Sequence, residues 1–251
     1  MLFEEQTLYA AVAIVALLLT IVLVAWVRRF EGATRRHMLF APAAMASLTV
    51  SYAGMAAGIL LFHGPAGAPV YVTRFLDYGI IYAFIAAYTG QIANADRGVI
   101  LSGVLGLWAF SFGAMIRHLA PPPFDSIASL LVLSGFAYSL WLLLRPYTRA
   151  AASVSDDRRL LFGKLRNVQL IMLITYLLVA LTTRQALGLL GAFTGIYVSA
   201  YLDLFSHVAL TGLILRSEPA IRSLTGTHPS PLTFLTGSET DRHTAETPAD
   251  D

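Results

Sequence analysis

Hydrophobic stretches follow one another along the chain, separated by short polar segments. A run of about 20 apolar residues is long enough for a helix to cross the hydrocarbon core of a bilayer. Seven such runs are present, at residues 8–27, 38–62, 69–93, 98–119, 126–144, 165–183 and 186–215. The pattern predicts an all-α bundle of seven transmembrane helices in a multi-pass protein of the cell membrane.

The chain changes character after Arg216, where it becomes rich in Pro, Ser, Thr and acidic residues. Such a composition does not bury enough apolar surface to order a segment. We therefore expect a membrane domain over residues 1–216 and a disordered polar tail over residues 217–251.

Positive charge collects in two of the predicted loops. Since arginine and lysine favour cytoplasmic loops, these loops should share the cytoplasmic side. The N-terminus is then outside and the C-terminus cytoplasmic, which agrees with an odd number of spans. The basic residues are Arg28, Arg29, Arg35 and Arg36 after the first run, and Arg145, Arg149, Arg158, Arg159 and Lys164 after the fifth.

Composition narrows the class of protein further. Hydrophobic residues make up 57% of the chain and charged residues 13%, whereas soluble domains carry about 25% charged residues. The formal net charge of +2 gives no reason to expect a nucleic-acid partner, and the absence of cysteine excludes disulfides and thiol chemistry. The first run lacks a basic start and a small-residue cleavage site, so we interpret it as a retained helix.

Ionisable residues stand inside two of the apolar runs. Arg74, Asp77 and Tyr78 are spaced i, i+3 and i+4, and Asp203 and His207 are four apart, so each set shares one face of a helix. An arginine at membrane depth requires counter-charge. We therefore expect Arg74 and the two aspartates to meet inside the bundle, with tyrosine hydroxyls and water completing their hydrogen bonds.

Four segments resemble those of one family. The run from Thr73 to Tyr78 is similar to the third-helix signature of microbial rhodopsins, Arg-Tyr-x-Asp-Trp. Their second, sixth and seventh helices resemble Ser51–Ala56, Lys164–Val168 with Tyr176, and Tyr201–Leu204. The resemblance runs from about residue 8 to residue 216, and it implies the bacteriorhodopsin-like seven-helix fold.

The same resemblance raises a question at residue 207. The family binds retinal as a Schiff base on a lysine four residues after the seventh-helix aspartate, and His207 occupies that position here. An imidazole forms no stable imine with an aldehyde, and Lys164 is at the far end of the sixth helix. The resemblance therefore implies a family member without covalent retinal, although a chromophore bound non-covalently stays open.

The residues expected around the chromophore also depart from the family pattern. The family places tryptophans in the third and sixth helices, and these positions correspond to Tyr78, Leu173 and Ala180. Tyr88 stands where pumps carry a proton-donor carboxylate. The full set of pocket positions that we infer from the resemblance is Tyr52, Tyr78, Tyr82, Leu173, Tyr176 and Ala180.

The retained Arg74, Asp77 and Asp203 then need a new role. In the family the two aspartates are the counterion of a protonated Schiff base, so here their partner is Arg74, a protonated His207, or both. The network is either a structural ion cluster, an ion or proton handler, or a signalling switch. For His207 itself a core histidine, a pH-sensitive group and a metal ligand with Asp203 remain open, and no complete metal site is expected.

We prefer a sensory or regulatory role over three alternatives. Tyr201 and Ser206 resemble the sensory branch of the family, where the sixth-helix tyrosine, here Tyr176, takes part in signalling through a transducer membrane protein. The alternatives are proton or ion conduction along the remaining polar network, non-covalent photoreception, and a structural role. No nucleophile–base pair stands out, so we do not expect an enzyme.

Small residues suggest close helix contacts. Gly54 and Gly58, and Gly191 and Gly195, form two Gly-x-x-x-Gly pairs that favour close backbone approach within the bundle or in a homo-oligomer. The aromatic stripe of Phe193, Tyr197 and Tyr201 is interpreted as packing or as a partner surface.

Overall fold

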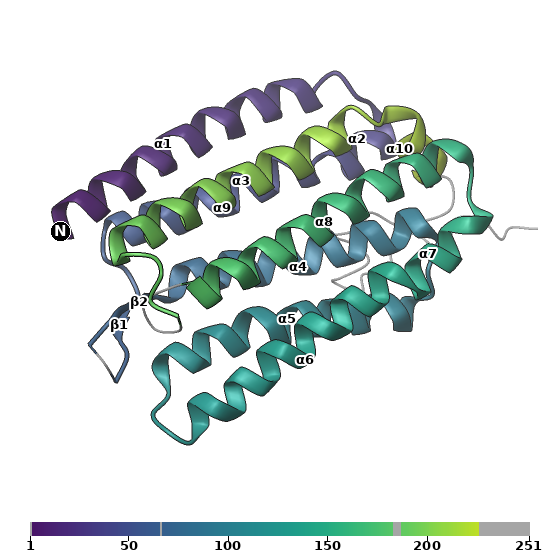
Figure 1. Cartoon of the computed structure of the whole chain (residues 1–251). Coiled ribbons are helices and arrows are strands. Elements are labelled where there is room, and N and C mark those ends of the chain that lie inside the picture. Colours follow the sequence, from purple (N-terminus) through teal and green to yellow (C-terminus); the bar gives the residue numbers. More distant parts are fainter. Residues whose placement is uncertain (1, 66, 183–186, 226–251) are drawn as a thin grey trace, which may run out of the picture.

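Seven long helices lie side by side in the computed structural model, which describes residues 2–65, 67–182 and 187–225 (Figure 1). They are α1 (Leu2–Val27), α3 (Phe40–Ala56), α4 (Val72–Ala93), α5 (Arg97–Leu119), α6 (Phe124–Leu144), α8 (Asp156–Thr182) and α9 (Ala192–Leu215). The predicted all-α seven-helix bundle is thereby confirmed. Shorter elements at its ends are α2 (Gly32–Met38), α7 (Pro146–Ala150), a 3-10 helix (Ala151–Ser153), α10 (Glu218–Thr225) and the strands β1 (Leu61–His63) and β2 (Pro69–Tyr71).

Within the described residues, six helical segments are long and apolar enough to cross a membrane. They are Glu4–Val27, Gly32–Ala56, Arg97–Leu119, Phe124–Ser153, Asp156–Thr182 and Thr194–Leu215. The seventh long helix, α4, is more polar, but 15 of its 22 residues are buried inside the bundle. Most of its polar side chains therefore face other helices, which is the arrangement that polar groups at membrane depth require.

The end of the second predicted span and the start of the third form a hairpin rather than helix. α3 ends at Ala56, and β1 pairs antiparallel with β2. Gly58 and Leu60 have φ angles of 68° and 54°, which an α-helix of L-residues does not accept. The predicted helical boundaries at residues 62 and 69 are therefore wrong, and the hairpin marks one end of the bundle.

α8 begins at Asp156, well before the predicted start of the sixth span at residue 165. The early turn is held by Arg158, whose guanidinium is buried and donates to the carbonyl oxygens of Gln91 at 2.7 Å and Ile92 at 3.1 Å. These carbonyls lie in the last turn of α4, where helix carbonyls lack the usual i+4 donor, and the Gln91 oxygen also accepts from the N–H of the C-cap residue Asn94 at 3.0 Å. The predicted start of the seventh span, residue 186, is outside the described residues.

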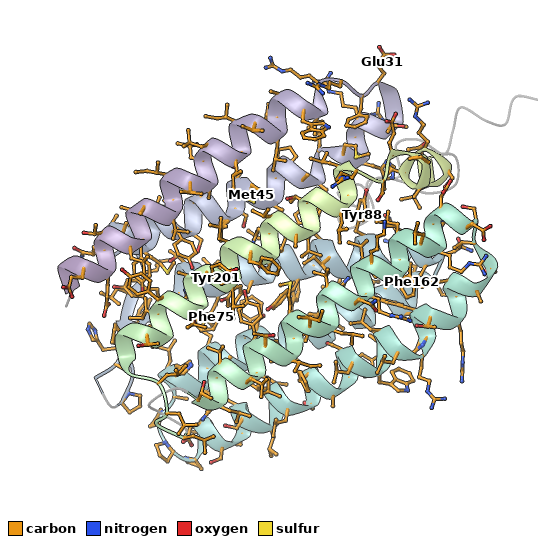
Figure 2. All side chains as sticks on the ribbon, turned by 45° about the horizontal axis from the view of Figure 1, so that its top comes forward. Glu31, Met45, Phe75, Tyr88, Phe162 and Tyr201 are labelled. Carbon is orange, nitrogen blue, oxygen red and sulfur yellow. The ribbon has the colours of Figure 1, made fainter. Side chains whose placement is uncertain are left out.

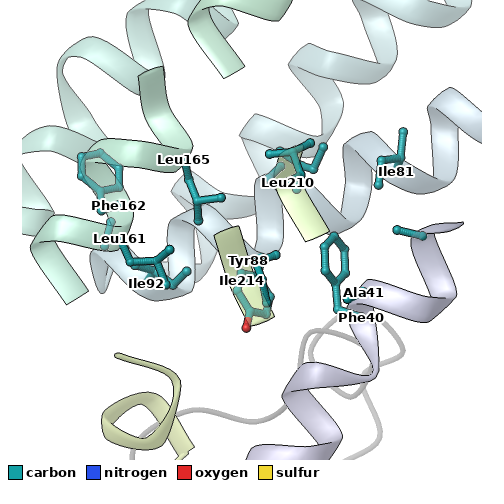
Figure 3. Packing of buried hydrophobic residues seen from close by; sticks show 14 of the residues in the cluster. Phe40, Ala41, Ile81, Tyr88, Ile92, Leu161, Phe162, Leu165, Leu210 and Ile214 are labelled. Carbon is teal, nitrogen blue, oxygen red and sulfur yellow. The ribbon is translucent and has the colours of Figure 1, made fainter. Parts of the chain in front are cut away.

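Apolar side chains fill the half of the bundle nearer the arginine-rich loops. We call this set the inner cluster and define it by Phe40, Ile81, Tyr88, Leu210 and Ile214, contributed by α3, α4 and α9 (Figure 3). Tyr88 stacks on Phe40 with ring centroids 5.2 Å apart. The inner cluster thus closes the space between these helices on that side.

A second apolar cluster joins α1, α3 and α9 towards the hairpin end. Tyr9, Met45 and Tyr52 are among its buried members. Figure 2 shows Met45 within the bundle, whereas Glu31 projects from the loop that follows α1. The two clusters leave a polar layer between the helices that the candidate site occupies.

Only one of the four glycines in the predicted Gly-x-x-x-Gly pairs has a close neighbour. A Cβ added at Gly54 would meet Thr73 Cγ2 at 3.0 Å, so α3 and α4 approach closely there. Gly58 and Gly195 have nothing within 4 Å, and Gly191 meets only Thr194 at 4.0 Å. Within the bundle, the predicted role in close packing therefore applies to Gly54 alone.

The first part of the segment expected to be a disordered tail is helical. Residues 218–225 form α10, whose Ala220, Ile221 and Leu224 are buried against the bundle. Their i, i+1 and i+4 spacing gives an otherwise polar segment one apolar stripe, and docking buries it. The prediction of disorder is therefore wrong for α10, and residues 226–251 are outside the described part of the chain.

Candidate functional site

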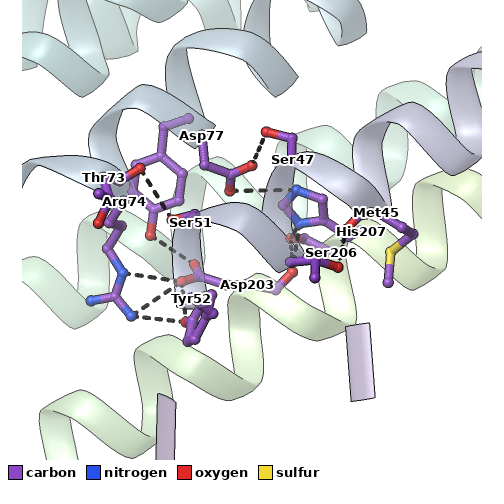
Figure 4. Close-up of polar contacts among 12 residues, drawn as sticks. Met45, Ser47, Ser51, Tyr52, Thr73, Arg74, Asp77, Asp203, Ser206 and His207 are labelled. Carbon is purple, nitrogen blue, oxygen red and sulfur yellow. Dashed lines mark hydrogen bonds and ion pairs between the residues drawn. The ribbon is translucent and has the colours of Figure 1, made fainter. Parts of the chain in front are cut away.

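Asp203 of α9 is the centre of a dense hydrogen-bond cage (Figure 4). One carboxylate oxygen accepts from Tyr52 at 2.6 Å and from Arg74 Nε at 3.1 Å. The other accepts from the hydroxyls of Tyr78 and Tyr176, each at 2.7 Å. Since a carboxylate has about four acceptor positions, the fully buried Asp203 is saturated by donors from α3, α4 and α8.

Arg74 supplies the positive charge for Asp203. Its Nη2 lies 3.1 Å from the carboxylate, and it also donates to the Tyr52 hydroxyl at 3.0 Å. The guanidinium is 5.8 Å from the centre of the Tyr52 ring. Its side chain keeps 18% exposure, whereas that of Asp203 keeps 1%. Arg74 therefore pairs with Asp203 and still reaches the surface of the bundle at the hairpin end.

Asp77 forms a separate pair with His207. One oxygen of Asp77 accepts a hydrogen bond from Ser47 of α3, and the other lies 3.6 Å from His207 Nε2. His207 Nδ1 lies 2.7 Å from the main-chain oxygen of Asp203, which also accepts from the Ser206 hydroxyl at 2.7 Å. The expected single meeting point of Arg74, Asp77 and Asp203 is thus divided into two neighbouring pairs.

The direction of side chains on α4 explains this division. Cα–Cβ bonds on a helix tilt towards its N-terminus, so the long Arg74 side chain extends back towards the hairpin and meets Asp203 there. Asp77, one turn further into the bundle, is left with Ser47 and His207 (Figure 4). Sequence spacing identified the shared face of α4 but not which partner each residue would choose.

The inferred pocket positions are divided between the cage and a small cavity. Tyr52 and Tyr78 donate to Asp203. Tyr82, Leu173 and Tyr176 line a cavity of about 20 Å³ together with Ile85, Leu107, Gln169 and Met172. That volume holds about one water molecule. The sixth inferred pocket position, Ala180, lies exposed on α8 and is not among the residues that line the cavity.

Tyrosine rings occupy much of the space between α4 and α8. Tyr78 stacks on Tyr82 with centroids 5.7 Å apart and meets Tyr176 edge-on at 5.8 Å. Each ring is therefore held by another ring or by Asp203, and the described cavity is far below the roughly 300–1,000 Å³ of small-molecule pockets.

The three residues expected to take part in signalling lie in different environments. Tyr176 and Ser206 both bind Asp203, through its carboxylate and its main-chain oxygen respectively. Tyr201 is instead 67% exposed on the outer face of α9 and stacks on Phe205 at 6.1 Å. The structure therefore brings two of them into the site and places the third on the surface.

Sequence reasoning missed two polar residues that the structure brings into play. Ser47 contacts Asp77, and its signal was available, since Ser47 and Ser51 are four apart and both face α4. Gln169 donates to Thr89 at 2.6 Å between α8 and α4. Nothing in the sequence indicates that Gln169 and Thr89 are partners, because only the packing of α8 against α4 brings them together.

Comparisons with known proteins agree with this fold. The model of the family described as "Bacteriorhodopsin-like protein" matches residues 4–219. Similar solved structures include a cyanorhodopsin from Tolypothrix sp. NIES-4075, with a TM-score of 0.79, 15% identity, and coverage of 89% of this chain and 97% of that one. No curated protein sequence gives a significant match.

Two further solved structures show the same likeness. Thermophilic rhodopsin from Rubrobacter xylanophilus has a TM-score of 0.77 and 18% identity, covering 88% of this chain and 99% of that one. A light-driven proton pump from Coccomyxa subellipsoidea has a TM-score of 0.77 and 16% identity, covering 84% and 96%. At these identities the likeness establishes the fold alone.

Proposed function

The chain belongs to the bacteriorhodopsin-like protein family and is a multi-pass membrane protein, and on this premise we propose that it works without covalent retinal as a sensory or regulatory protein. The observation that carries the proposal is the buried His207 at the position where the family resemblance puts the retinal lysine. Its imidazole is already held between Asp203 and Asp77.

The rest of the chain offers no replacement for the missing lysine. Lys164 is the only lysine and is exposed near the start of α8. At a rise of about 1.5 Å per residue, it lies about 18 Å along α8 from Tyr176, which touches Asp203. An aldehyde bound beside Asp203 would therefore have no amine within reach.

The partners of the two carboxylates also support this proposal. Asp203 is saturated by four donors, and Asp77 has Ser47 and His207. A protonated Schiff base is thus not needed to balance either aspartate. The small cavity beside Tyr82 and Tyr176 fits the same picture, since it leaves little room for a chromophore.

The sensory half of the proposal is supported by the link between the buried cage and the surface of α9. Tyr176 of α8 holds the Asp203 carboxylate, and one helical turn of α9 connects Asp203 to the exposed Tyr201 and Phe205. A change at the cage can therefore reach a face that a transducer-like membrane partner could contact.

Ion conduction, the alternative function, is disfavoured by the inner cluster. Beyond His207 along α9 the next buried side chains are Thr211, which bonds to its own helix, and the apolar Leu210 and Ile214. A conducting path needs polar or hydrated groups throughout. Along α9, the polar layer around Asp77 and Asp203 thus lacks a continuation towards the arginine-rich end.

An absorption spectrum of the protein purified from cells supplied with all-trans retinal tests the retinal-free proposal. The wild-type protein should show no visible band, because neither His207 nor Lys164 can form the Schiff base. A band in the wild type would overturn the proposal and indicate a non-covalent photoreceptor.

The variant His207→Lys is the matched control for the same spectrum. We expect it to stay colourless when folded, because the tyrosine rings fill the space around the cavity. A coloured variant would instead show that one substitution removed the photochemistry.

Co-purification from the same membranes tests the sensory half of the proposal. A membrane partner that the wild type retains and that Tyr201→Ala loses would support a sensory role. A protein that purifies without partners would contradict it.

A further inference from the structure

His207 is fixed through one ring nitrogen and faces a carboxylate with the other. Nδ1 lies 2.7 Å from the Asp203 carbonyl oxygen, which only accepts hydrogen bonds, so Nδ1 carries a hydrogen. Nε2 lies 3.6 Å from Asp77 Oδ2 and has no hydrogen-bond partner among the described residues. The tautomer is therefore set, and Nε2 is the nitrogen that can gain or lose a proton.

The pair is unfavourable without an additional proton. A neutral His207 would direct the lone pair of Nε2 at a carboxylate oxygen of Asp77, and both side chains are only 2% exposed. Two acceptors facing each other away from water lose hydrogen bonding without compensation. One proton between Nε2 and Oδ2 supplies the missing donor, whichever atom holds it.

Charge balance selects a proton over a metal ion. Arg74 already neutralises Asp203, so the charge of Asp77 requires one further positive charge. A divalent ion would leave a surplus positive charge in the bundle interior. In addition, the described residues contain no group of three or more His, Cys, Asp or Glu side chains that could hold a metal.

The surroundings of the pair determine the side from which the proton comes. Arg74, in the first turn of α4, is partly exposed at the hairpin end. In the opposite direction about 24 Å of α4 separates Asp77 from Ala93, and that distance is packed by the inner cluster. The shorter and more polar route therefore opens towards the hairpin.

In the part of the chain that the structure describes, the charged and titratable groups around the pair are tyrosine hydroxyls and one ion pair. They are Tyr52 from α3, Arg74, Tyr78 and Tyr82 from α4, Tyr176 from α8 and Asp203 from α9, with Tyr9 of α1 behind Tyr52.

We infer that Asp77 and His207 form a binding site for one exchangeable proton, supplied from the side of the membrane on which the hairpin lies. The inference deepens the proposed function by naming its stimulus, and it rests on the retinal-free state. When the proton is lost, the Asp77 carboxylate of α4 and Nε2 of His207 on α9 face each other as two acceptors. The contact between α4 and α9 is therefore the part of the structure that responds.

Nitrogen NMR of the histidine-labelled full-length protein in oriented vesicles tests the inference. The signal of His207, identified by its absence in His207→Gln, should show Nδ1 protonated throughout. Nε2 should gain and lose its proton when pH is varied on the hairpin side. An Nε2 signal that does not change, or that follows pH on the other side, would overturn it.

Two variants make the result specific. In Asp77→Asn the amide can donate to Nε2 itself, so the transition should disappear. In Ser47→Ala the carboxylate loses a hydrogen bond, so the pair should bind its proton about tenfold more tightly. The exposed His63 in His63→Gln serves as the control that changes neither. A transition that persists in Asp77→Asn, or that Ser47→Ala does not move, contradicts the shared proton.

The outcome is separable from that of the retinal experiment. A coloured wild-type protein would overturn the proposed function, whatever the NMR result. A colourless protein whose His207 does not titrate would overturn only the proton site.

Discussion

At the scale of single residues, the two aspartates differ in how completely their hydrogen bonds are satisfied. Asp203 accepts from Tyr52, Arg74, Tyr78 and Tyr176, whereas the Asp77 carboxylate has one hydroxyl and a distant imidazole. The donors around Asp203 occupy the acceptor positions of its carboxylate, whereas one oxygen of Asp77 faces the imidazole at 3.6 Å. Asp203 is therefore the fixed part of the site, and Asp77 is the part that can change.

Removing one donor from Asp203 should have a measurable cost. In Tyr78→Phe the carboxylate loses one of its four donors, so we expect thermal unfolding to show a loss of about 1–2 kcal/mol. Tyr82→Phe is the matched control, because the Tyr82 hydroxyl makes no hydrogen bond within the described residues and the ring stack is kept. Equal stability of the two variants would contradict the assigned role of Tyr78.

At the scale of elements, α4 organises the site and is fixed at both ends. Near its start Arg74 joins it to α9, and near its end Arg158 of α8 donates to the carbonyls of Gln91 and Ile92. A cation at a helix C-terminus also interacts favourably with the helix dipole. Arg158 therefore helps to hold the register of α4 against α8, on which the position of Asp77 depends.

The capping role of Arg158 can be separated from a general effect of charge. Arg158→Met keeps the apolar stem but removes the two buried hydrogen bonds to the Gln91 and Ile92 carbonyls, so we expect a loss of about 1–3 kcal/mol and faster hydrogen exchange in the last turn of α4. Arg159→Met removes an exposed arginine that pairs with Asp156 on the surface, and should cost less than about 1 kcal/mol. A similar loss in both variants would argue against the cap.

At the scale of the whole molecule, the bundle has a polar layer towards the hairpin and an apolar half towards the arginine-rich loops. The polar layer contains both carboxylate pairs, and the inner cluster closes the other half (Figures 3 and 4). This asymmetry is suited to a site that exchanges protons with one side of the membrane and does not carry them across.

The asymmetry predicts that the protein does not conduct protons. Proteoliposomes that contain the wild-type protein should dissipate an imposed pH gradient no faster than empty liposomes, because the inner cluster offers no polar path. A protonophore added at the end shows that the gradient was present. Proton flux that depends on the protein would show that the inner cluster does not close the bundle, and would favour the conduction alternative.

Much of the fold and the membership of the site follow from the sequence. Seven apolar runs of spanning length predict the bundle, since only helices satisfy the backbone of a single span in lipid. The spacing of Arg74 and Asp77, and of Asp203 and His207, predicts two polar faces that must turn inwards. The identity of residue 207 excludes a Schiff base on that side chain, because an imine requires a primary amine.

Tertiary structure decided the pairing within the site and the ends of the elements. Periodicity gives the face on which a residue lies but not its partner, so it could not show that Arg74 binds Asp203 while Asp77 meets Ser47 and His207. Hydropathy likewise did not distinguish the hairpin or α10 from their surroundings, because backbone angles and docking against other helices fix these segments. The sequence by itself thus determined which groups are buried together, and only packing determined which of them form pairs.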